Sequence, residues 1–347
     1  MKNCMTRRGF LQRAAAGVAG PLVLPRLSLG ASADGRLRHA AIGVANMGKG
    51  DLFAIAGSGR VDIVALCDID ENHLNAAAQP LPNARLYRDW RELLDKEKDN
   101  IDSVNVSTPD HMHAPIALSA IELGKHVYCQ KPLAHEVFEA RRLTEAARNA
   151  GVVTQMGIQI HSYDVYRRAV MMLRSGVIGK VKEWHSWCSA SYSTPGMDRP
   201  AGEDPVPPTV NWDSWIGVAP MRPYKEGVYH PRSWRTWRDF GCGSMGDFGC
   251  HIFDPVFTAL KLGAPRTVRA EAPEFTAEVW PQWSIVHYEF PGTHWTAGDT
   301  IQGTWYDGGK QPPHELAPPL AEGQKWPDMG SLILGEEGAM LLPHIDE

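Results

Sequence analysis

The stretch "HAAIGVANMG" (39–48) decides the fold that this sequence predicts. An apolar run, 39–44, leads into a glycine-containing turn, and a helical stretch follows near 50–57. In a doubly wound α/β sheet, such a strand, turn and helix N-terminus together hold the pyrophosphate of a dinucleotide. Gly43 and Gly48 keep the spacing Gly-x-Gly-x-x-Gly, whereas Ala45 replaces the second glycine and its methyl group would crowd the pyrophosphate slightly.

Strand-like and helix-like segments alternate after this turn. Continuous apolar runs of this kind are typical of strands that are buried on both faces of a parallel sheet. The predicted strands are 39–44, 61–68, 102–109, 126–132 and 152–159, and the predicted helices between them are 50–57, 71–79, 110–123 and 136–149. The sequence therefore predicts a Rossmann domain over residues 34–160.

Asp68 ends the second predicted strand, 20 residues after Gly48. An acid at this point can accept hydrogen bonds from both ribose hydroxyls of NAD, and it repels the 2′-phosphate of NADP. No arginine follows in "DIDENH" (68–73), so NAD is favoured over NADP. A solvated acid at the end of a strand is the alternative interpretation.

The first 33 residues resemble a twin-arginine (Tat) export signal. Arg7 and Arg8 stand in "MTRRGFL" (5–11), an apolar run of small residues covers 14–24, and Ala31-Ser32-Ala33 matches the pattern that a signal peptidase cuts. The resemblance implies a periplasmic or otherwise exported protein that the Tat machinery carries already folded. A frayed basic N-terminus is the alternative.

Composition limits the partners of the remaining chain. Residues 34–347 fit two domains and carry 40 acidic against 30 basic residues, which argues against nucleic acids and anionic membranes. No CxxC pair and no apolar run of 18 residues occur, so the sequence predicts neither a disulfide framework nor stable membrane insertion.

Residues 161–347 predict a second, α+β domain with a large, mostly antiparallel sheet. A helix is expected over 161–179, and strand-like runs follow at 283–290, 300–308 and 331–342. Six tryptophans lie between 184 and 237 and fit a carbohydrate substrate, although core packing is the alternative for most of them. Because the chain stops just after the last strand-like run, we expect that its C-terminus is truncated.

The stretch "GCGSMGDFGCHIFDPVFTALKLG" (241–263) predicts a helix that starts near Ser244–Asp247. Asp247 and His251 are four residues apart and share one helical face. A capping box from Ser244 to Asp247 and a structural core histidine are the alternatives. A zinc site that includes His230 or Cys250 lacks a ligand set at the usual spacing, so no metal is predicted.

Two motifs resemble the Gfo/Idh/MocA oxidoreductase family, which includes glucose–fructose oxidoreductase and inositol dehydrogenases. The first, within 107–136, comprises Thr108-Pro109, His113, Gly124-Lys125-His126-Val127 and Gln130-Lys131-Pro132; the second comprises Asp247, Gly249, His251 and Asp254. Gln130 departs from the glutamate that the family pattern has at this position, which removes a negative charge beside Lys131.

The resemblance implies roles for individual residues. Lys131, Asp247 and His251 are expected to be catalytic, with the histidine in the pKa range that suits a proton acceptor. The expected cofactor contacts are Gly43, Ala45, Asn46, Met47, Gly48, Asp68, Thr108, Pro109, His113, Gln130 and Lys131. The expected substrate contacts are Gln159, His161, Tyr229, His230, Trp234, Arg235, Asp247 and His251. Family relatives pair their large sheets, so a homo-oligomer is expected.

Three functional hypotheses remain open at this point. The first is an exported NAD-dependent oxidoreductase that acts on a secondary hydroxyl of a sugar, polyol or glycoside and recycles a tightly bound cofactor. The second is a redox-neutral, NAD-dependent glycosidase that works by transient oxidation and elimination. The third is a non-catalytic sugar-binding protein that retains the cofactor.

Overall fold

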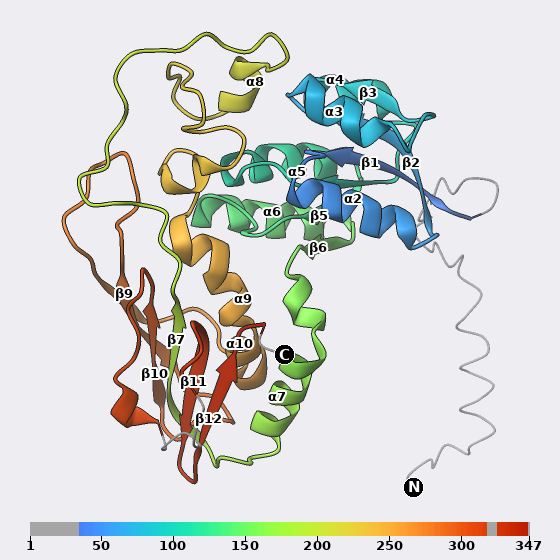
Figure 1. The fold of residues 1–347 in the computed structure, drawn as a ribbon. Helices are drawn as coiled ribbons and strands as arrows, with labels where there is room; N and C mark the ends of the chain where they lie inside the picture. Colours follow the sequence, from blue (N-terminus) through green and yellow to red (C-terminus); the bar gives the residue numbers. More distant parts are fainter. Residues whose placement is uncertain (1–34, 318–324, 346–347) are drawn as a thin grey trace, which may run out of the picture.

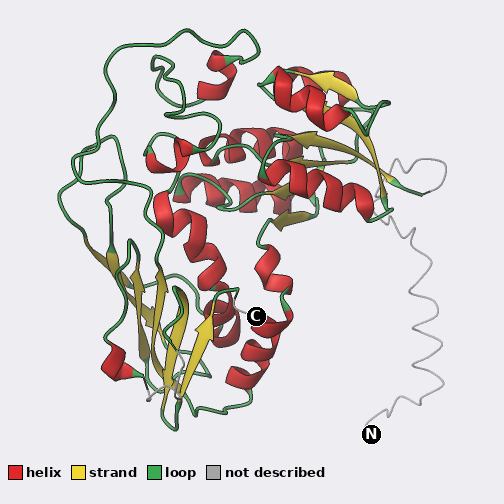
Figure 2. Cartoon of the chain, in the orientation of Figure 1, coloured by secondary structure: helices red, strands yellow, loops and turns green. Residues whose placement is uncertain are grey.

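The computed structural model describes residues 35–317 and 325–345, in which two sheets carry most of the core (Figures 1 and 2). The predicted export signal lies outside the described residues. Among these residues, no helix has the length and apolarity needed to cross a bilayer.

The first sheet is six-stranded and parallel, in the order β3-β2-β1-β4-β5-β6. Its strands are β1 (Leu37–Ile42), β2 (Val61–Cys67), β3 (Arg85–Tyr87), β4 (Ser103–Val106), β5 (His126–Cys129) and β6 (Thr154–Met156). Its helices are α2 (Met47–Gly57), α3 (Glu71–Ala78), α4 (Trp90–Glu97), α5 (His113–Glu122) and α6 (Val137–Ala150), with a 3-10 turn at Asp110–Met112. The sequence did not predict β3 and α4.

Local capping fixes where these helices begin. The side chain of Asp70 accepts a hydrogen bond from Asn72 N, and the side chain of Asp89 accepts one from Arg91 N. Each donor lies two residues after its acceptor, as is usual at a helix N-cap. Before α6, Glu136 and Glu139 form a reciprocal capping box, and Gly151 ends the helix in a left-handed conformation. The caps place α3 directly after the carboxyl end of β2, where Asp68 lies.

The second sheet is mixed and mostly antiparallel, in the order β12-β11-β7-β10-β9-β8, with β7 and β10 parallel. Its strands are β7 (Val181–Cys188), β8 (Thr267–Glu271), β9 (Ile285–Pro291), β10 (Thr300–Tyr306), β11 (Met329–Gly335) and β12 (Ala339–Pro343). Helices α7 (Asp164–Arg174), α9 (Cys250–Ile252) and α10 (Asp254–Leu260) accompany it. The predicted fold class is confirmed, and the run 331–342 is a hairpin of β11 and β12.

A crossing segment, residues 207–235, returns from the second domain to the first (Figure 1). It contains α8 (Trp212–Ile216) and ends within a 3-10 turn at Ser233–Thr236. Glu71 N donates to Thr209 O at 2.9 Å, and Asn211 N donates to Ile69 O at 2.9 Å, so this segment pairs with the chain between β2 and α3. Its aromatic side chains form a core of their own with Trp237, Phe240 and Val279.

The glycines of α2 provide a stability prediction. A Cβ at buried Gly48 would lie 2.1 Å from the carbonyl oxygen of Gly43, whereas a Cβ at exposed Gly50 would meet nothing within 4 Å. We expect Gly48→Ala to lower the free energy of unfolding by about 1–3 kcal/mol because backbone must move. Gly50→Ala should raise this free energy by up to about 1 kcal/mol through helix propensity. Urea unfolding followed by tryptophan fluorescence measures both, and equal effects of the two variants would contradict the predicted close packing.

Candidate active site

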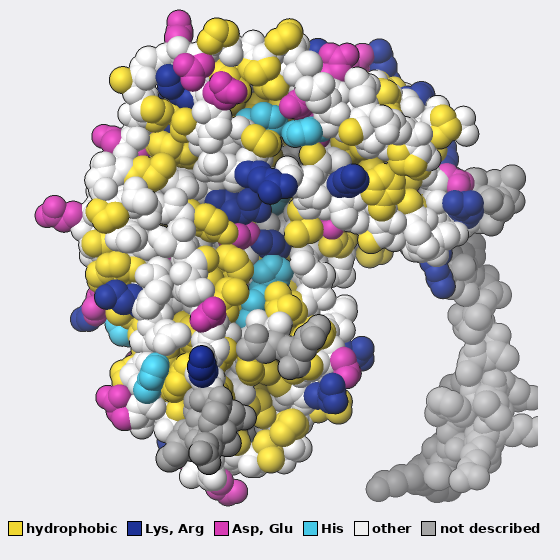
Figure 3. Space-filling model, in the orientation of Figure 1, with side chains coloured by type: hydrophobic (Ala, Val, Ile, Leu, Met, Phe, Trp, Pro, Cys, Tyr) yellow, Lys and Arg dark blue, Asp and Glu magenta, His cyan; other side chains and the backbone are white. Residues whose placement is uncertain are grey.

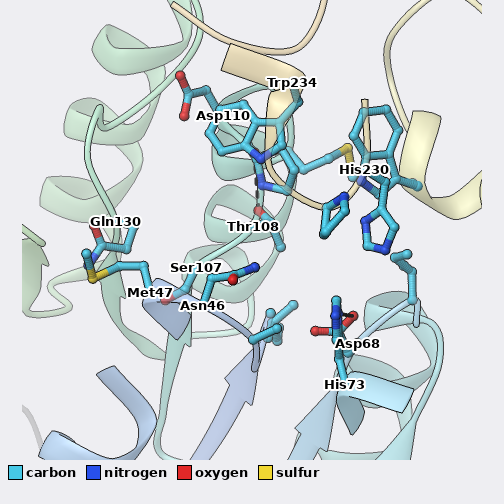
Figure 4. Close-up of a pocket in the computed structure, with 18 of the residues that line it drawn as sticks. Asn46, Met47, Asp68, His73, Ser107, Thr108, Asp110, Gln130, His230 and Trp234 are labelled. Atoms are coloured by element: carbon cyan, nitrogen blue, oxygen red, sulfur yellow. Dashed lines mark hydrogen bonds and ion pairs between the residues drawn. The ribbon is translucent and has the colours of Figure 1, made fainter. Parts of the chain in front are cut away.

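A pocket lies at the carboxyl ends of the central parallel strands, covered by the crossing segment (Figure 4). Most of the predicted cofactor contacts line it: Gly43, Ala45, Asn46, Met47, Asp68, Thr108, Pro109, Gln130 and Lys131. From the crossing segment come His230, Arg232, Trp234 and Arg235. Figure 3 shows Lys, Arg and His side chains gathered near the middle of this face, around a hollow.

The turn after β1 is shaped to receive a pyrophosphate. Gly43 has φ +81°, and a Cβ there would lie 2.6 Å from the carbonyl oxygen of Ser107. Asn46, before α2, makes no side-chain cap, and the first turn of α2 contains no acid. The N–H groups and the positive end of the helix dipole therefore face the pocket without a competing anion, as a dinucleotide requires.

Asp68 is held in place by backbone donors. Its Oδ2 accepts from Val44 N and its Oδ1 accepts from Asp70 N, both at 3.0 Å. The carboxylate is buried and lines the pocket beyond the glycine turn. This geometry fits the binding of ribose hydroxyls.

Gln130 has a specific partner that explains the departure from the family pattern. Its Nε2 donates to both carboxylate oxygens of Asp51, at 3.0 and 2.9 Å, while its Oε1 accepts from Lys131 N at 3.1 Å. Ser107 Oγ donates to the same carboxylate at 2.7 Å. A glutamate at 130 would set a second carboxylate against Asp51, so the amide is the side chain that this environment fits.

Lys131 and Asp247 form an ion pair that joins the two domains. The two side chains are only 9% and 12% exposed, and Lys131 Nζ also donates to Asp247 O at 3.0 Å. Tyr192 Oη donates to the other carboxylate oxygen, and Arg235 Nε lies 3.2 Å from Asp247 Oδ1. Burial raises the pKa of Asp247, but the charges of Lys131 and Arg235 outweigh it and hold this pKa below its ordinary value.

His251 lies one turn beyond Asp247 and is 6% exposed. Burial, reinforced by the charge of Lys131, lowers the pKa of His251 to about 4, so the imidazole is neutral near pH 7. Its Nδ1 is buried and has no hydrogen-bond partner within the described chain. A neutral imidazole with an unused nitrogen is able to accept a proton or to hydrogen-bond a hydroxyl.

Asp247 lies in a π-helical turn, Met245–Gly249, rather than at the start of an ordinary α-helix. Ser244 makes no side-chain cap, so the capping-box alternative is wrong. π-Helical turns within helices are frequent at functional sites because they re-aim side chains. Here the turn carries Asp247 toward Lys131.

Four of the predicted side-chain contacts lie apart from the pocket lining and from the group at Lys131. His113 is 1% exposed, and its two ring nitrogens face the carbonyl oxygens of Pro132 and Thr108, so it positions both loops. Tyr229 is 1% exposed and packs in the aromatic core of the crossing segment. Gln159 is exposed on a turn, and exposed His161 binds Asp254 through Nδ1 at 2.8 Å beside a separate groove.

Sequence reasoning missed several residues of the site. Three of them lie in or beside the motifs of the first domain: Asp51, Ser107 and Asp110. Tyr192 follows β7, and His73 lies in the first turn of α3. Burial raises the pKa of Asp110, which lines the pocket, to about 7. Only His73 carried a usable signal, because it stands five residues after Asp68 on the same side of the predicted sheet.

The contact between Gln130 and Asp51 makes a reciprocal prediction. Gln130→Glu should lower the free energy of unfolding by about 1–3 kcal/mol at pH 8, because a buried carboxylate would then face the half-buried carboxylate of Asp51. The repulsion between the two carboxylates raises the pKa of the introduced carboxyl, so this group takes up a proton as the pH falls to 5. The loss in the free energy of unfolding should therefore be smaller at pH 5 than at pH 8. Adding Asp51→Asn should restore stability, since the new amide donates to the new carboxylate and the contact is reversed. Denaturation at both pH values tests this prediction, and an unrescued double variant would contradict it.

Comparisons with known proteins place these features in a family. Residues 37–158 match the family described as "Oxidoreductase family, NAD-binding Rossmann fold", and residues 194–296 match "Oxidoreductase family, C-terminal alpha/beta domain". Together the two matches cover more than half of the chain.

Individual relatives and a solved structure agree with this match. A levoglucosan dehydrogenase of Pseudarthrobacter phenanthrenivorans is 26% identical over 48% of this chain and 34% of its own length. A glycosyl hydrolase family 109 protein of Shewanella pealeana is 29% identical over 47% of this chain and 37% of its own length. The chain thus spans less than half the length of these curated relatives.

The structural comparison supports the fold over most of the chain. The WlbA dehydrogenase of Bordetella pertussis, solved with NADH and UDP-GlcNAcA, has a TM-score of 0.62 at 19% identity and covers 88% of this chain and 77% of its own. The two matched domains, the glycine turn with Asp68, and the two motifs at Lys131 and Asp247 lead to one conclusion. The chain belongs to the Gfo/Idh/MocA oxidoreductase family, and its N-terminal part is an NAD-binding Rossmann domain.

Proposed function

We propose that this chain oxidises a secondary hydroxyl of a sugar, polyol or glycoside, with NAD as cofactor. The observation that carries the proposal is the buried group formed by Lys131, Asp247 and neutral His251. This group adjoins the end of β5. A dinucleotide whose pyrophosphate lies at the glycine turn would place its nicotinamide there. The names of the dehydrogenase relatives support this substrate class.

The residues divide the work of oxidation between them. Bound NAD supplies the hydride acceptor, so the chain has to handle the hydroxyl proton. The Lys131 ammonium can hydrogen-bond the substrate oxygen and stabilise the negative charge that develops on it. Because its pKa is about 4, neutral His251 can take the proton only as the hydride leaves, when the forming carbonyl makes that proton strongly acidic. Asp247 keeps the lysine aimed, while Tyr192 and Arg235 hold Asp247.

Trp234 and Arg235 support a carbohydrate substrate. The guanidinium of Arg235 lies over the ring of Trp234, 4.3 Å from its centroid, so it covers one indole face, and both residues line the pocket. Indole faces pack well on sugar C–H surfaces, and a guanidinium donates to sugar hydroxyls. Trp234 is as buried as Trp212 and Trp215 and shares their aromatic core, and what sets it apart is the charge of Arg235 beside it at the pocket.

We also propose that the protein is exported by the Tat route with its cofactor in place. Contacts across the pocket support retention of a cofactor: Arg232 Nε donates to Asn46 Oδ1 at 2.9 Å, and His230 Nε2 lies 3.2 Å from Asp70 Oδ2. A retained cofactor has to be reset by a second substrate or within one reaction cycle.

A redox-neutral glycosidase is the second candidate. The relative described as a glycosyl hydrolase family 109 protein favours it, because that protein is 29% identical over 47% of this chain. In that reaction a ring carbon would lose a hydride to bound NAD, and the same residues would remove the neighbouring proton that the new ketone makes acidic. The aglycone would then be eliminated, water would add to the resulting double bond, and the hydride would return to the ketone. The buried ion pair of Lys131 and Asp247, with neutral His251 beside it, argues against a sugar-binding protein without turnover.

The test combines cofactor analysis with paired substrates. We expect purified protein to release NAD on denaturation and to turn over one of two probes, an aldose with a ketose acceptor or a set of nitrophenyl glycosides. Lys131→Met should lower kcat by about 10²–10⁴-fold. Lys182→Met, at an exposed position of β7, should leave kcat unchanged. Thermal melts establish that both variants fold.

Each outcome of this test is decisive. Ketose-dependent oxidation of the aldose supports the oxidoreductase, and release of nitrophenol without net NADH supports the glycosidase. A protein that contains NAD but turns over neither probe supports the binding protein instead. Protein that neither contains nor binds NAD would overturn all three.

The export proposal has its own prediction. Replacing Arg7 and Arg8 by lysine keeps the charge but removes the paired guanidinium groups, so we expect the protein to stay in the cytoplasm of a bacterial host with a Tat system. Arg13→Lys is the control and should be exported normally. Cell fractionation measures both variants, and unaltered export of the double variant would contradict the proposal.

A further inference from the structure

Asp70, His73 and His230 form a second cluster of titratable side chains, away from the group at Lys131. His230 Nε2 lies 3.2 Å from Asp70 Oδ2, and His73 Nδ1 lies 3.9 Å from the same oxygen. The three ligand atoms all lie within 4.8 Å of one another. Figure 4 shows His230 on one side of the pocket, with His73 and Asp68 on the other.

The spacing of these atoms suits a small divalent cation. Zinc binds imidazole nitrogen and carboxylate oxygen at about 2.0–2.2 Å, so the ligand atoms of a tetrahedral site lie about 3.3–3.5 Å apart. The observed separations from Asp70 Oδ2, 3.2 and 3.9 Å, bracket this value. Small rotations of the two imidazoles would therefore complete the geometry.

The surroundings prepare the site. Asp70 Oδ1 accepts from Asn72 N at 3.0 Å as the cap of α3, which fixes the carboxylate and leaves Oδ2 directed at the histidines. Asp68 Oδ1 lies 3.8 Å from the same nitrogen of His73, Nδ1, so its carboxylate adds a second negative charge beside the site.

We propose that Asp70, His73 and His230 bind one divalent transition-metal ion of the zinc class. Two ligands belong to α3 and its cap, and the third belongs to the crossing segment, so the ion fastens that segment to the Rossmann domain beside the pocket. The fourth coordination position is left to water or to a ligand in the pocket. Ion binding does not depend on the proposed reaction.

The test starts from the full chain after treatment with a chelator and dialysis. We expect Zn²⁺ titrated against a chromophoric chelator to bind with one equivalent per chain and to raise the melting temperature. Co²⁺ should give the visible absorption of a tetrahedral site with nitrogen and oxygen ligands. Repeating the titration with added NAD shows whether the cofactor and the ion bind together.

Variants separate this site from adventitious binding. His73→Ala and His230→Ala should each weaken Zn²⁺ binding by roughly 100-fold or more and abolish the melting shift. Asp70→Asn keeps the helix cap, because asparagine also caps helices, but removes the anionic ligand and should weaken binding likewise. His287→Ala is the matched control, since His287 faces Glu271 at 3.3 Å on the second sheet. It should bind Zn²⁺ as the parent does.

Two results would overturn the proposal. One is the absence of stoichiometric Zn²⁺ binding to the chelator-treated protein. The other is binding that survives unchanged in His73→Ala and His230→Ala, which would place the ion elsewhere. In either case the three residues form a histidine–carboxylate contact between the crossing segment and α3, without a metal.

Discussion

The buried ion pair between Lys131 and Asp247 is the constraint on which the site depends. Removing two charges from water is costly, and their attraction compensates only where further hydrogen bonds complete the geometry. Tyr192 and Arg235 provide these bonds from two other segments of the second domain. Lys131, Tyr192 and the stretch from Arg235 to Asp247 must therefore come together at one carboxylate before the end of β5 faces a finished pocket.

Much of the fold could be predicted from the sequence, because buried parallel strands leave continuous apolar runs. The exceptions have physical reasons. Strand β3 has three residues, of which Arg85 and Leu86 are exposed, so it leaves no apolar run. The run 331–342 was predicted as one strand-like unit, but Gly335 and Gly338 allow the chain to turn there and form a hairpin. Strand β7 was not predicted, because polar His185 and Ser186 lie buried between its two tryptophans and interrupt any apolar run.

Site residues that belong to a sequence motif could be predicted. Contacts between residues that only the fold brings together could not. Lys131 and Asp247 came from two separate motifs, and neither motif shows that they touch. The partner of Gln130 is Asp51, 79 residues earlier, and no local pattern links an amide to that acid. His73 and His230 likewise stand far apart in sequence, so a search for the usual ligand spacings passes over them.

The route of the crossing segment has a consequence for how the protein forms. Asp70, which follows β2, forms an isolated bridge with Val210, so the two lie together only after a loop of more than 100 residues has closed. Closing such a loop is entropically costly and slows folding, because the contact forms only after the intervening chain has been ordered. During synthesis the Rossmann strands emerge first, yet their pocket stays open until the second domain has folded. A dinucleotide can thus enter the pocket from the side before the crossing segment closes over it.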